Sequence, residues 1–151
     1  MTRERDLTII PFQSENQAEV KSLIQAGLVE HWGWLDPSKN PDLDDIGQTY
    51  RNALFLVAWH GNRIVGTGAL VPRSTATAEI VRMSVSAEMR RKGVGSEILQ
   101  RLREHAIAAG YQRLVLETTE TWSEVIEFYE WLGFKLTHHL GGDAYFALEL
   151  S

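Results

Sequence analysis

Residues 81–96 read Val-Arg-Met-Ser-Val-Ser-Ala-Glu-Met-Arg-Arg-Lys-Gly-Val-Gly-Ser, and the order of residue types here is the most informative in the chain. Its first residues are mostly apolar and end a predicted strand near Val85. A short basic loop follows. An amphipathic helix begins near Gly95, because apolar side chains then recur at helical spacing. A strand, a tight loop and a helix in this order are typical of an α/β domain.

The loop combines three features that favour an anion. Amides at the start of a helix have no partner within the helix, and the helix dipole attracts negative charge there. Gly93 and Gly95 lack a Cβ, so the backbone can approach a phosphate closely, and Arg90, Arg91 and Lys92 add three positive charges. The spacing matches neither a Walker loop nor a dinucleotide fingerprint. The pattern predicts a pyrophosphate site, and the alternative is a plain turn with solvated cations.

Hydrophobic periodicity and turn residues extend this unit over the whole chain. Ser14 is the predicted cap of the first helix, with Gln17 at the capping-box position. Gly61-Asn62 predicts a tight hairpin, and Gly110 and Gly133 stand where two helices should end. Strands are predicted at residues 7–12, 54–60, 63–71, 76–85, 113–118, 134–139 and 144–150, and helices at 14–31, 43–50, 96–109 and 123–132.

The predicted element order is β-α-α-β-β-β-α-β-α-β-β. It contains no internal repeat, low-complexity tract or linker, so we expect a single domain over residues 1–151. The fold class is α/β, with a mixed central sheet of about seven strands and about four helices on both faces.

Composition narrows the function classes. The chain has no cysteine, which excludes disulfide frameworks and thiolate sites. A net charge of −5 argues against a broad nucleic-acid or anionic-membrane footprint. The apolar runs are shorter than the roughly 18 residues of a membrane span, and the mixed charges of residues 1–6 do not resemble a secretory signal. We therefore expect a soluble cytoplasmic protein that binds neither nucleic acid nor membranes.

Two motifs resemble those of the GNAT superfamily of N-acetyltransferases. Arg90-x-x-Gly93-x-Gly95, between a strand and a helix, matches the family's Q/R-x-x-G-x-G/A motif. Residues 127–134, Glu-Phe-Tyr-Glu-Trp-Leu-Gly-Phe, are similar to the family's lYeklGF segment. The chain between the motifs holds the helix, strand and half helix that the family requires. In strand and helix order the resemblance extends over essentially the whole chain.

The resemblance implies acetyl-CoA as the cofactor and assigns residues to it. In the family, amides of the first motif hold the pyrophosphate, and the backbone of the preceding strand holds the pantetheine arm. A separation between that strand and the next exposes further amides for the thioester carbonyl. The cofactor-binding residues implied in this way are Met83, Ser84, Val85, Arg90, Arg91, Lys92, Gly93, Val94, Gly95 and Ser96. Ser96 is equally well explained as a helix-start residue without a ligand.

Acetyl transfer to an amine requires a base, because an alkylamine is only about 0.04% neutral at pH 7. We expect Glu79 to be that base, since it lies on the strand leading to the cofactor and matches a position that many family members give to glutamate. Period-two alternation predicts that Glu79, Val81, Met83 and Val85 share one face, toward the substrate cleft. The alternative is an ordinary salt-bridged glutamate. A backbone amide near Met83 or Val85 would stabilise the oxyanion.

The second motif implies a general acid and contains one neighbouring departure from the family. Tyr129 occupies the tyrosine that usually protonates the departing thiolate, and the alternative is a core aromatic residue. The motif residues that we assign to packing are Phe128, Trp131, Leu132 and Phe134. Trp122 stands where many members carry an asparagine that contacts the pantetheine arm, and the candidate replacements are Thr118, Thr119 and Ser123.

The acceptor site is expected near the first helix pair and its connecting loop. The substrate-binding candidates are His31, Trp32, Trp34 and Asp36, with Asp36 holding the positive charge of a small amine. Alternatively, the two tryptophans close the core or contact another subunit. No histidine has a partner at metal-ligand spacing, so no metal site is expected.

These observations predict an acetyl-CoA-dependent N-acetyltransferase. The acceptor is a primary amine of a small molecule or peptide, and transfer is direct, without a covalent enzyme intermediate. The alternative is a noncatalytic acyl-CoA sensor or interaction domain on the same scaffold. A homodimer, common in the family, is left open.

Overall fold

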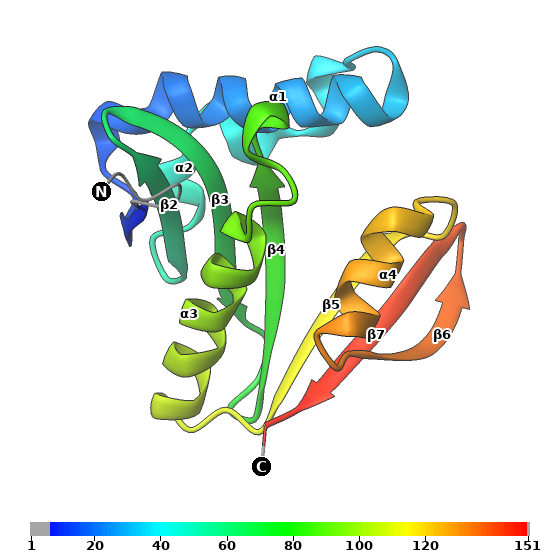
Figure 1. Cartoon of the computed structure of the whole chain (residues 1–151). Coiled ribbons are helices and arrows are strands. Elements are labelled where there is room, and N and C mark those ends of the chain that lie inside the picture. Colours follow the sequence, from blue (N-terminus) through cyan, green and yellow to red (C-terminus); the bar gives the residue numbers. More distant parts are fainter. Residues whose placement is uncertain (1–6, 151) are drawn as a thin grey trace.

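A seven-stranded mixed sheet runs through the computed structural model, which describes residues 7–150 (Figure 1). Its strand order is β1-β2-β3-β4-β5-β7-β6, and every neighbouring pair is antiparallel except the parallel pair β4–β5. The predicted element order and fold class are confirmed. The strands are β1 (Leu7–Pro11), β2 (Leu54–His60), β3 (Arg63–Pro72), β4 (Thr77–Val85), β5 (Arg113–Thr119), β6 (Lys135–Leu140) and β7 (Asp143–Glu149).

Helices cover both faces of the sheet. The α-helices are α1 (Gln17–Trp32), α2 (Ile46–Thr49), α3 (Val94–Ala108) and α4 (Ser123–Trp131). Short 3-10 helices are η1 (Ser14–Asn16), η2 (Pro37–Lys39), η3 (Pro41–Asp44) and η4 (Ala87–Met89). No helix within residues 7–150 combines the length and apolar character needed to cross a membrane. The expectation that residues 1–6 carry no secretory signal concerns a segment outside the described residues.

Two hydrophobic cores lie on opposite faces of the sheet. Ile98 and Leu102 of α3 are fully buried in the first core, which also holds Tyr129 of α4. Val20 of α1 and Ile46 of α2 are fully buried in the second. The apolar residues of α3 at helical spacing therefore cover one face, while α1 and α2 cover the other.

The close packing of α3 on β3 depends on a glycine. A Cβ at Gly68 would lie 2.6 Å from both Ile98 Cγ2 and Met83 Sδ. No side chain fits at that distance, so a larger residue would push α3 away from the sheet.

The start of α1 differs from the prediction. The Gln13 amide donates to Asn16 Oδ1 at 3.0 Å, and Gln13 caps η1, so Ser14 is not the cap. The preference for serine at helix caps does not show which of several neighbouring polar residues the chain will use.

Candidate functional site

Strands β4 and β5 are paired at their N-terminal ends and then separate. The pairing covers only residues 77–79 of β4 against 113–115 of β5, although β4 continues to Val85 and β5 to Thr119. Figure 1 shows the two strands diverging as a V above this short segment. Main-chain groups of β4 that face the V beyond residue 79 have no partner strand on that side. We call this opening the fork, and it confirms the predicted separation of the strands.

A β-bulge interrupts β4 beside the fork. Arg82 and Met83 lie opposite the single residue Gly68 of β3. Arg82 has a φ of 55°, the left-handed region that side-chain-bearing residues rarely occupy. The Thr67 hydroxyl donates to the Arg82 carbonyl at 2.8 Å and helps to hold this conformation.

The bulge corrects the predicted face of Glu79. Val81 packs in the core beneath α1 and α2, and Glu79, two residues earlier, faces the same side. Met83 and Val85 pack instead in the core beneath α3. The expectation that all four side chains share a face is wrong, because the extra residue of the bulge breaks the alternation. Glu79 is therefore separated from Met83 and Val85 by the backbone of β4.

The turn into α3 has the backbone that the predicted pyrophosphate site needs. Arg91 and Gly93 have positive φ angles of 62° and 85°, and Gly93 is the residue that precedes the helix. The first helical hydrogen bond of α3 runs from the Glu97 amide to the Gly93 carbonyl, at 3.0 Å. The amides of residues 94–96 precede it, in the first turn, where a helix leaves its amides available to an anion.

Gly95 also has a packing role that the sequence did not reveal. A Cβ at this position would lie 3.3 Å from Phe128 Cζ and 3.6 Å from Val85 Cγ2. The missing side chain therefore lets α4 approach the start of α3, in addition to any effect on a bound phosphate.

The arginines of the loop are paired with acidic side chains on either side. Arg90 forms an ion pair with Glu30 of α1 and donates from Nε to the Val85 carbonyl at 3.3 Å. Arg91 Nη2 lies 3.5 Å from Glu124 Oε1 of α4, and both of these side chains are 86% exposed. Exposed pairs of this kind are weak, so both arginines remain available to a phosphate.

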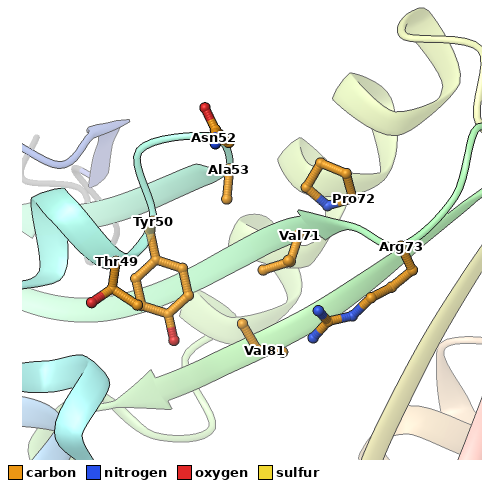
Figure 2. Close-up of a pocket in the computed structure, with 8 residues that line it drawn as sticks. All are labelled: Thr49, Tyr50, Asn52, Ala53, Val71, Pro72, Arg73 and Val81. Atoms are coloured by element: carbon orange, nitrogen blue, oxygen red, sulfur yellow. The ribbon is translucent and has the colours of Figure 1, made fainter.

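An open trough lies over β3 and β4, beside α2, and we describe it as an outer and an inner half. The outer half has a volume of about 400 Å³ and is lined by apolar groups of Tyr50, Ala53, Val71, Pro72 and Val81 (Figure 2). The inner half has a volume of about 420 Å³ and extends to the base of the fork. Tyr50, Val81 and one arginine line both halves, which makes the trough continuous.

The inner half of the trough is charged. Its charged side chains are Asp42, Arg73, Glu79, Arg82 and Glu117. Arg73 Nε donates to Glu79 Oε1 at 2.6 Å, with 51% and 17% of the respective side chains exposed. Glu79 thus lines a cavity, as expected of the predicted base, and also forms the salt bridge of the alternative interpretation. Figure 2 shows the Arg73 guanidinium turned in over β4, toward Val81.

A half-buried network joins η3 and the residue after α2 to the bulge of β4. Asp42 accepts hydrogen bonds from Arg82 Nη2 at 2.6 Å and Nε at 2.8 Å, and from the Tyr50 hydroxyl at 2.6 Å. Burial opposes ionisation of Asp42, but the bonds from Arg82 and Tyr50 outweigh it and lower its pKa. Burial and the Asp42 carboxylate raise the pKa of Tyr50 to about 12. Arg82 also donates to Asn40 Oδ1 at 3.0 Å.

Glu117 of β5 is a site residue that sequence analysis missed. It lines the inner half of the trough together with Glu79. Partial burial raises the pKa of Glu117, the Tyr145 hydroxyl opposes this by hydrogen bonding to the carboxylate, and the nearby Asp143 and Glu79 raise it further. The Tyr145 ring stacks on His138 with ring centroids 4.5 Å apart. Alternation along β5 could have identified Glu117, because it points away from the buried leucines of that strand.

Tyr129 and Trp131 of the second motif have different environments. Tyr129 is buried and makes edge contacts with the rings of Phe128 and Phe134, at centroid distances of 5.2 and 5.8 Å. Burial raises the pKa of Tyr129. Its role as the acid stays a prediction. The assignment of Trp131 to packing is wrong, since 77% of the residue is exposed at the end of α4.

The predicted aromatic acceptor residues lie outside the trough. His31 stacks on Trp122 with ring centroids 4.2 Å apart, and Trp32 lies 5.5 Å from the same ring. The end of α1 therefore contacts the residue that precedes α4, across the fork. Trp32 and Trp34 are 53% and 60% exposed, so the suggestion that they close the core is wrong.

The carboxylate of Asp36 is used locally. It accepts from the Ser38 amide at 3.0 Å and from the Ser38 hydroxyl at 2.7 Å, and these bonds lower its pKa. Asp36 thereby caps η2, and it does not line the trough. Within residues 7–150, no group of three His, Asp or Glu side chains is placed to hold a metal ion.

The chain is similar to acetyltransferases of known sequence. Residues 19–134 match the family model described as the acetyltransferase (GNAT) family. The uncharacterized N-acetyltransferase YsnE of Bacillus subtilis is 40% identical over 83 residues, which cover 54% of this chain and 55% of YsnE. Human N-acetylaspartate synthetase is 30% identical over 119 residues, which cover 76% of this chain and 38% of the synthetase. The matches therefore span little more than half of YsnE and well under half of the synthetase.

Solved structures share the whole fold. A GNAT-family acetyltransferase from Staphylococcus aureus Mu50 superposes with a TM-score of 0.88 at 19% identity, covering 96% of this chain and 99% of that one. The PaiA N-acetyltransferase of Thermoplasma acidophilum, solved in complex with coenzyme A, gives a TM-score of 0.85 at 18% identity, again covering 96% and 99%. At these identities the likeness is one of fold.

Proposed function

The chain belongs to the acetyltransferase (GNAT) family, and from this premise we propose that it is an acetyl-CoA-dependent N-acetyltransferase. The acceptor is a primary amine of a small molecule or peptide, and both substrates are bound together before direct transfer. A cytoplasmic location, a homodimer and the absence of nucleic-acid or membrane binding stay predictions.

The observation that carries this proposal is the fork opening beside the turn into α3. Free amides of residues 94–96 suit a pyrophosphate, and the arginines at 90 and 91 can leave their exposed carboxylate partners for it. The main chain of residues 83–85 faces the fork without a partner strand, which suits an extended amide-containing arm. Acetyl-CoA, when bound, supplies the activated acetyl group as a thioester.

Glu79 supports the transfer by taking a proton from the acceptor. It lies at the end of the paired segment of β4 and β5, where the fork begins, and lines the trough on the opposite face from Met83. The acceptor ammonium would therefore approach from the trough. Arg73 holds Glu79 Oε1 at 2.6 Å, which fixes the orientation of the carboxylate and leaves its second oxygen for the amine or for a bridging water.

Tyr129 is the proposed proton donor to the departing sulfur. A phenol is protonated at neutral pH, as a donor requires, and the burial that raises the pKa of Tyr129 makes it a weaker acid than an exposed tyrosine. Because its ring packs between Phe128 and Phe134, the hydroxyl is held in place by the core.

A noncatalytic acyl-CoA sensor is the second candidate, and the Arg73–Glu79 pair favours it because an engaged carboxylate is a weaker base. The experiment that separates the two is an amine panel incubated with acetyl-CoA, with thiol detection and mass spectrometry of the products. The proposal predicts amine-dependent release of coenzyme A with one acetylated amine per thiol. Binding of coenzyme A with no release for any amine would favour the sensor.

A further inference from the structure

The trough has a size and continuity that suit one small molecule. Its halves, of about 400 and 420 Å³, share Tyr50, Arg73 and Val81. Small-molecule pockets typically measure about 300–1,000 Å³. The inner end meets the fork at Glu79, and the outer end lies over Val71 near the start of β2.

The inner end lacks one positive charge. Arg82 is paired with Asp42, and Arg73 is paired with Glu79. Glu117 lies opposite the uncharged Tyr145 of β7, and no cationic side chain within residues 7–150 forms an ion pair with it. A ligand with one cationic group next to Glu117 and Glu79 would complete the charge balance.

The outer end offers apolar surface and no free charge. Its walls are the Tyr50 ring, Ala53, Val71, Pro72 and Val81 (Figure 2). The polar residues Thr49 and Asn52 are uncharged, and the charged residue that lines this half, Arg73, is paired with Glu79. A ligand body without charge gains from burial here, whereas a second cation would find no carboxylate.

We propose that the trough selects a primary monoamine with a compact, uncharged, apolar body, such as an arylalkylamine. The ammonium lies between Glu79 and Glu117 at the fork, and the body lies over Val71 and Val81 against the Tyr50 ring. This inference names the acceptor class of the proposed acetyl transfer and rests on that function.

The same geometry acts against two other amine classes. An amino acid carries a carboxylate beside its amine, and that carboxylate would lie against Glu79 and Glu117. The cation within reach is Arg73, and if it turned to the ligand carboxylate it would leave Glu79, which it now holds at 2.6 Å, without a counterion. A diamine places its second ammonium among the apolar residues of the outer half, where it is desolvated without a partner.

The test compares three acceptors that differ in one feature each. 2-Phenylethylamine has the apolar body, phenylalanine adds a carboxylate, and putrescine replaces the ring with a second amine. Two readouts are used: isothermal titration of each amine into the chain saturated with coenzyme A, and kcat/KM for acetylation. We expect phenylethylamine to bind about tenfold or more tightly than either of the others, and to have a kcat/KM higher by a similar factor. A factor of this size is expected from one uncompensated charge at a partly shielded site.

Two substitutions probe the two ends. Glu117→Gln should weaken phenylethylamine binding about tenfold, whereas Glu127→Gln, on the exposed side of α4, should leave it unchanged. Asn52→Asp adds a carboxylate to the rim of the outer half, and it should raise the affinity for putrescine about tenfold relative to the affinity for phenylethylamine. Asn62→Asp makes the same change in the exposed β2–β3 turn and should not.

The outcomes separate this inference from the proposed function. Preferred acetylation of phenylalanine or putrescine would overturn the acceptor class and leave the transferase intact. Selective binding of phenylethylamine without coenzyme A release for any amine would support the acceptor class and contradict the transferase. Failure of phenylethylamine to bind would overturn the inference.

Discussion

The Asp42→Asn substitution removes one charge from the network that joins η3 and α2 to the bulge of β4. Asp42 accepts bonds of 2.6 and 2.8 Å from Arg82 and one of 2.6 Å from Tyr50. The Asp42 and Arg82 side chains are only 20% and 19% exposed. Asparagine keeps the shape and one acceptor oxygen, but it leaves the Arg82 guanidinium largely buried without a counterion.

Removing one partner of a fully buried ion pair costs about 3–5 kcal/mol. Because both Asp42 and Arg82 still reach water and one oxygen remains, we expect the free energy of unfolding to fall by about 2–4 kcal/mol. For a chain of 151 residues this lowers Tm by roughly 5–15 °C. Urea unfolding followed by tryptophan fluorescence, with calorimetry for Tm, measures both quantities.

Asp44→Asn is the matched control. Asp44 pairs with Lys21 at 2.9 Å, but these side chains are 67% and 33% exposed, so we expect a loss of about 0–1 kcal/mol. The pKa of Asp42 is lower in the folded chain than in the unfolded chain, where it is about 3.9. Its contribution to the free energy of unfolding is therefore fully present above about pH 3.9 and is lost as pH falls through the folded-state pKa. Equal destabilisation by the two substitutions at neutral pH would show that burial of the Asp42–Arg82 pair does not set its contribution.

Four further outcomes follow from the site. The folded-state pKa of Tyr50 is raised to about 12, so its contribution to the free energy of unfolding is fully present below about pH 10 and is lost as pH rises toward 12. Urea unfolding between about pH 9 and pH 12 should therefore show a smaller loss of stability for Tyr50→Phe than for the unchanged chain. Glu79→Gln should lower kcat/KM by about 10²–10⁴-fold, and an unchanged pH–rate profile would show that Glu79 is not the base. Tyr129→Phe should lower kcat by about tenfold or more with little effect on the Kd of coenzyme A measured by calorimetry, whereas equal losses in both would assign the residue to packing. Glu30→Gln releases Arg90 and should tighten coenzyme A binding by about 2–5-fold at low salt, an effect that should vanish at high salt if it is electrostatic.

Local patterns predicted most of the fold. Two runs of mostly apolar residues joined by the Gly61-Asn62 turn predicted β2 at its observed bounds and β3 to within one residue. The strand–loop–helix order around Gly93 and Gly95 predicted where the turn into α3 lies. These features depend on residues close together in the chain, which is why a single sequence is enough to recognise them.

Features that depend on distant contacts were not predicted. The bulge at Arg82 has no glycine or proline to mark it, because it is held by Thr67 of β3 and Asp42 of η3. The missed role of Glu117 arises from the pairing of β5 with β7, which places it opposite Tyr145. Trp131 fits the family motif but is exposed, since a motif does not state which way each side chain points.

A titration of the ¹⁵N-labelled chain with coenzyme A shows whether the turn into α3 holds the pyrophosphate. The amides of Val94, Gly95 and Ser96 should show the largest chemical-shift changes, accompanied by changes along the fork side of Met83–Val85. Saturable binding that leaves the first turn of α3 unperturbed would show that the pyrophosphate is not held there.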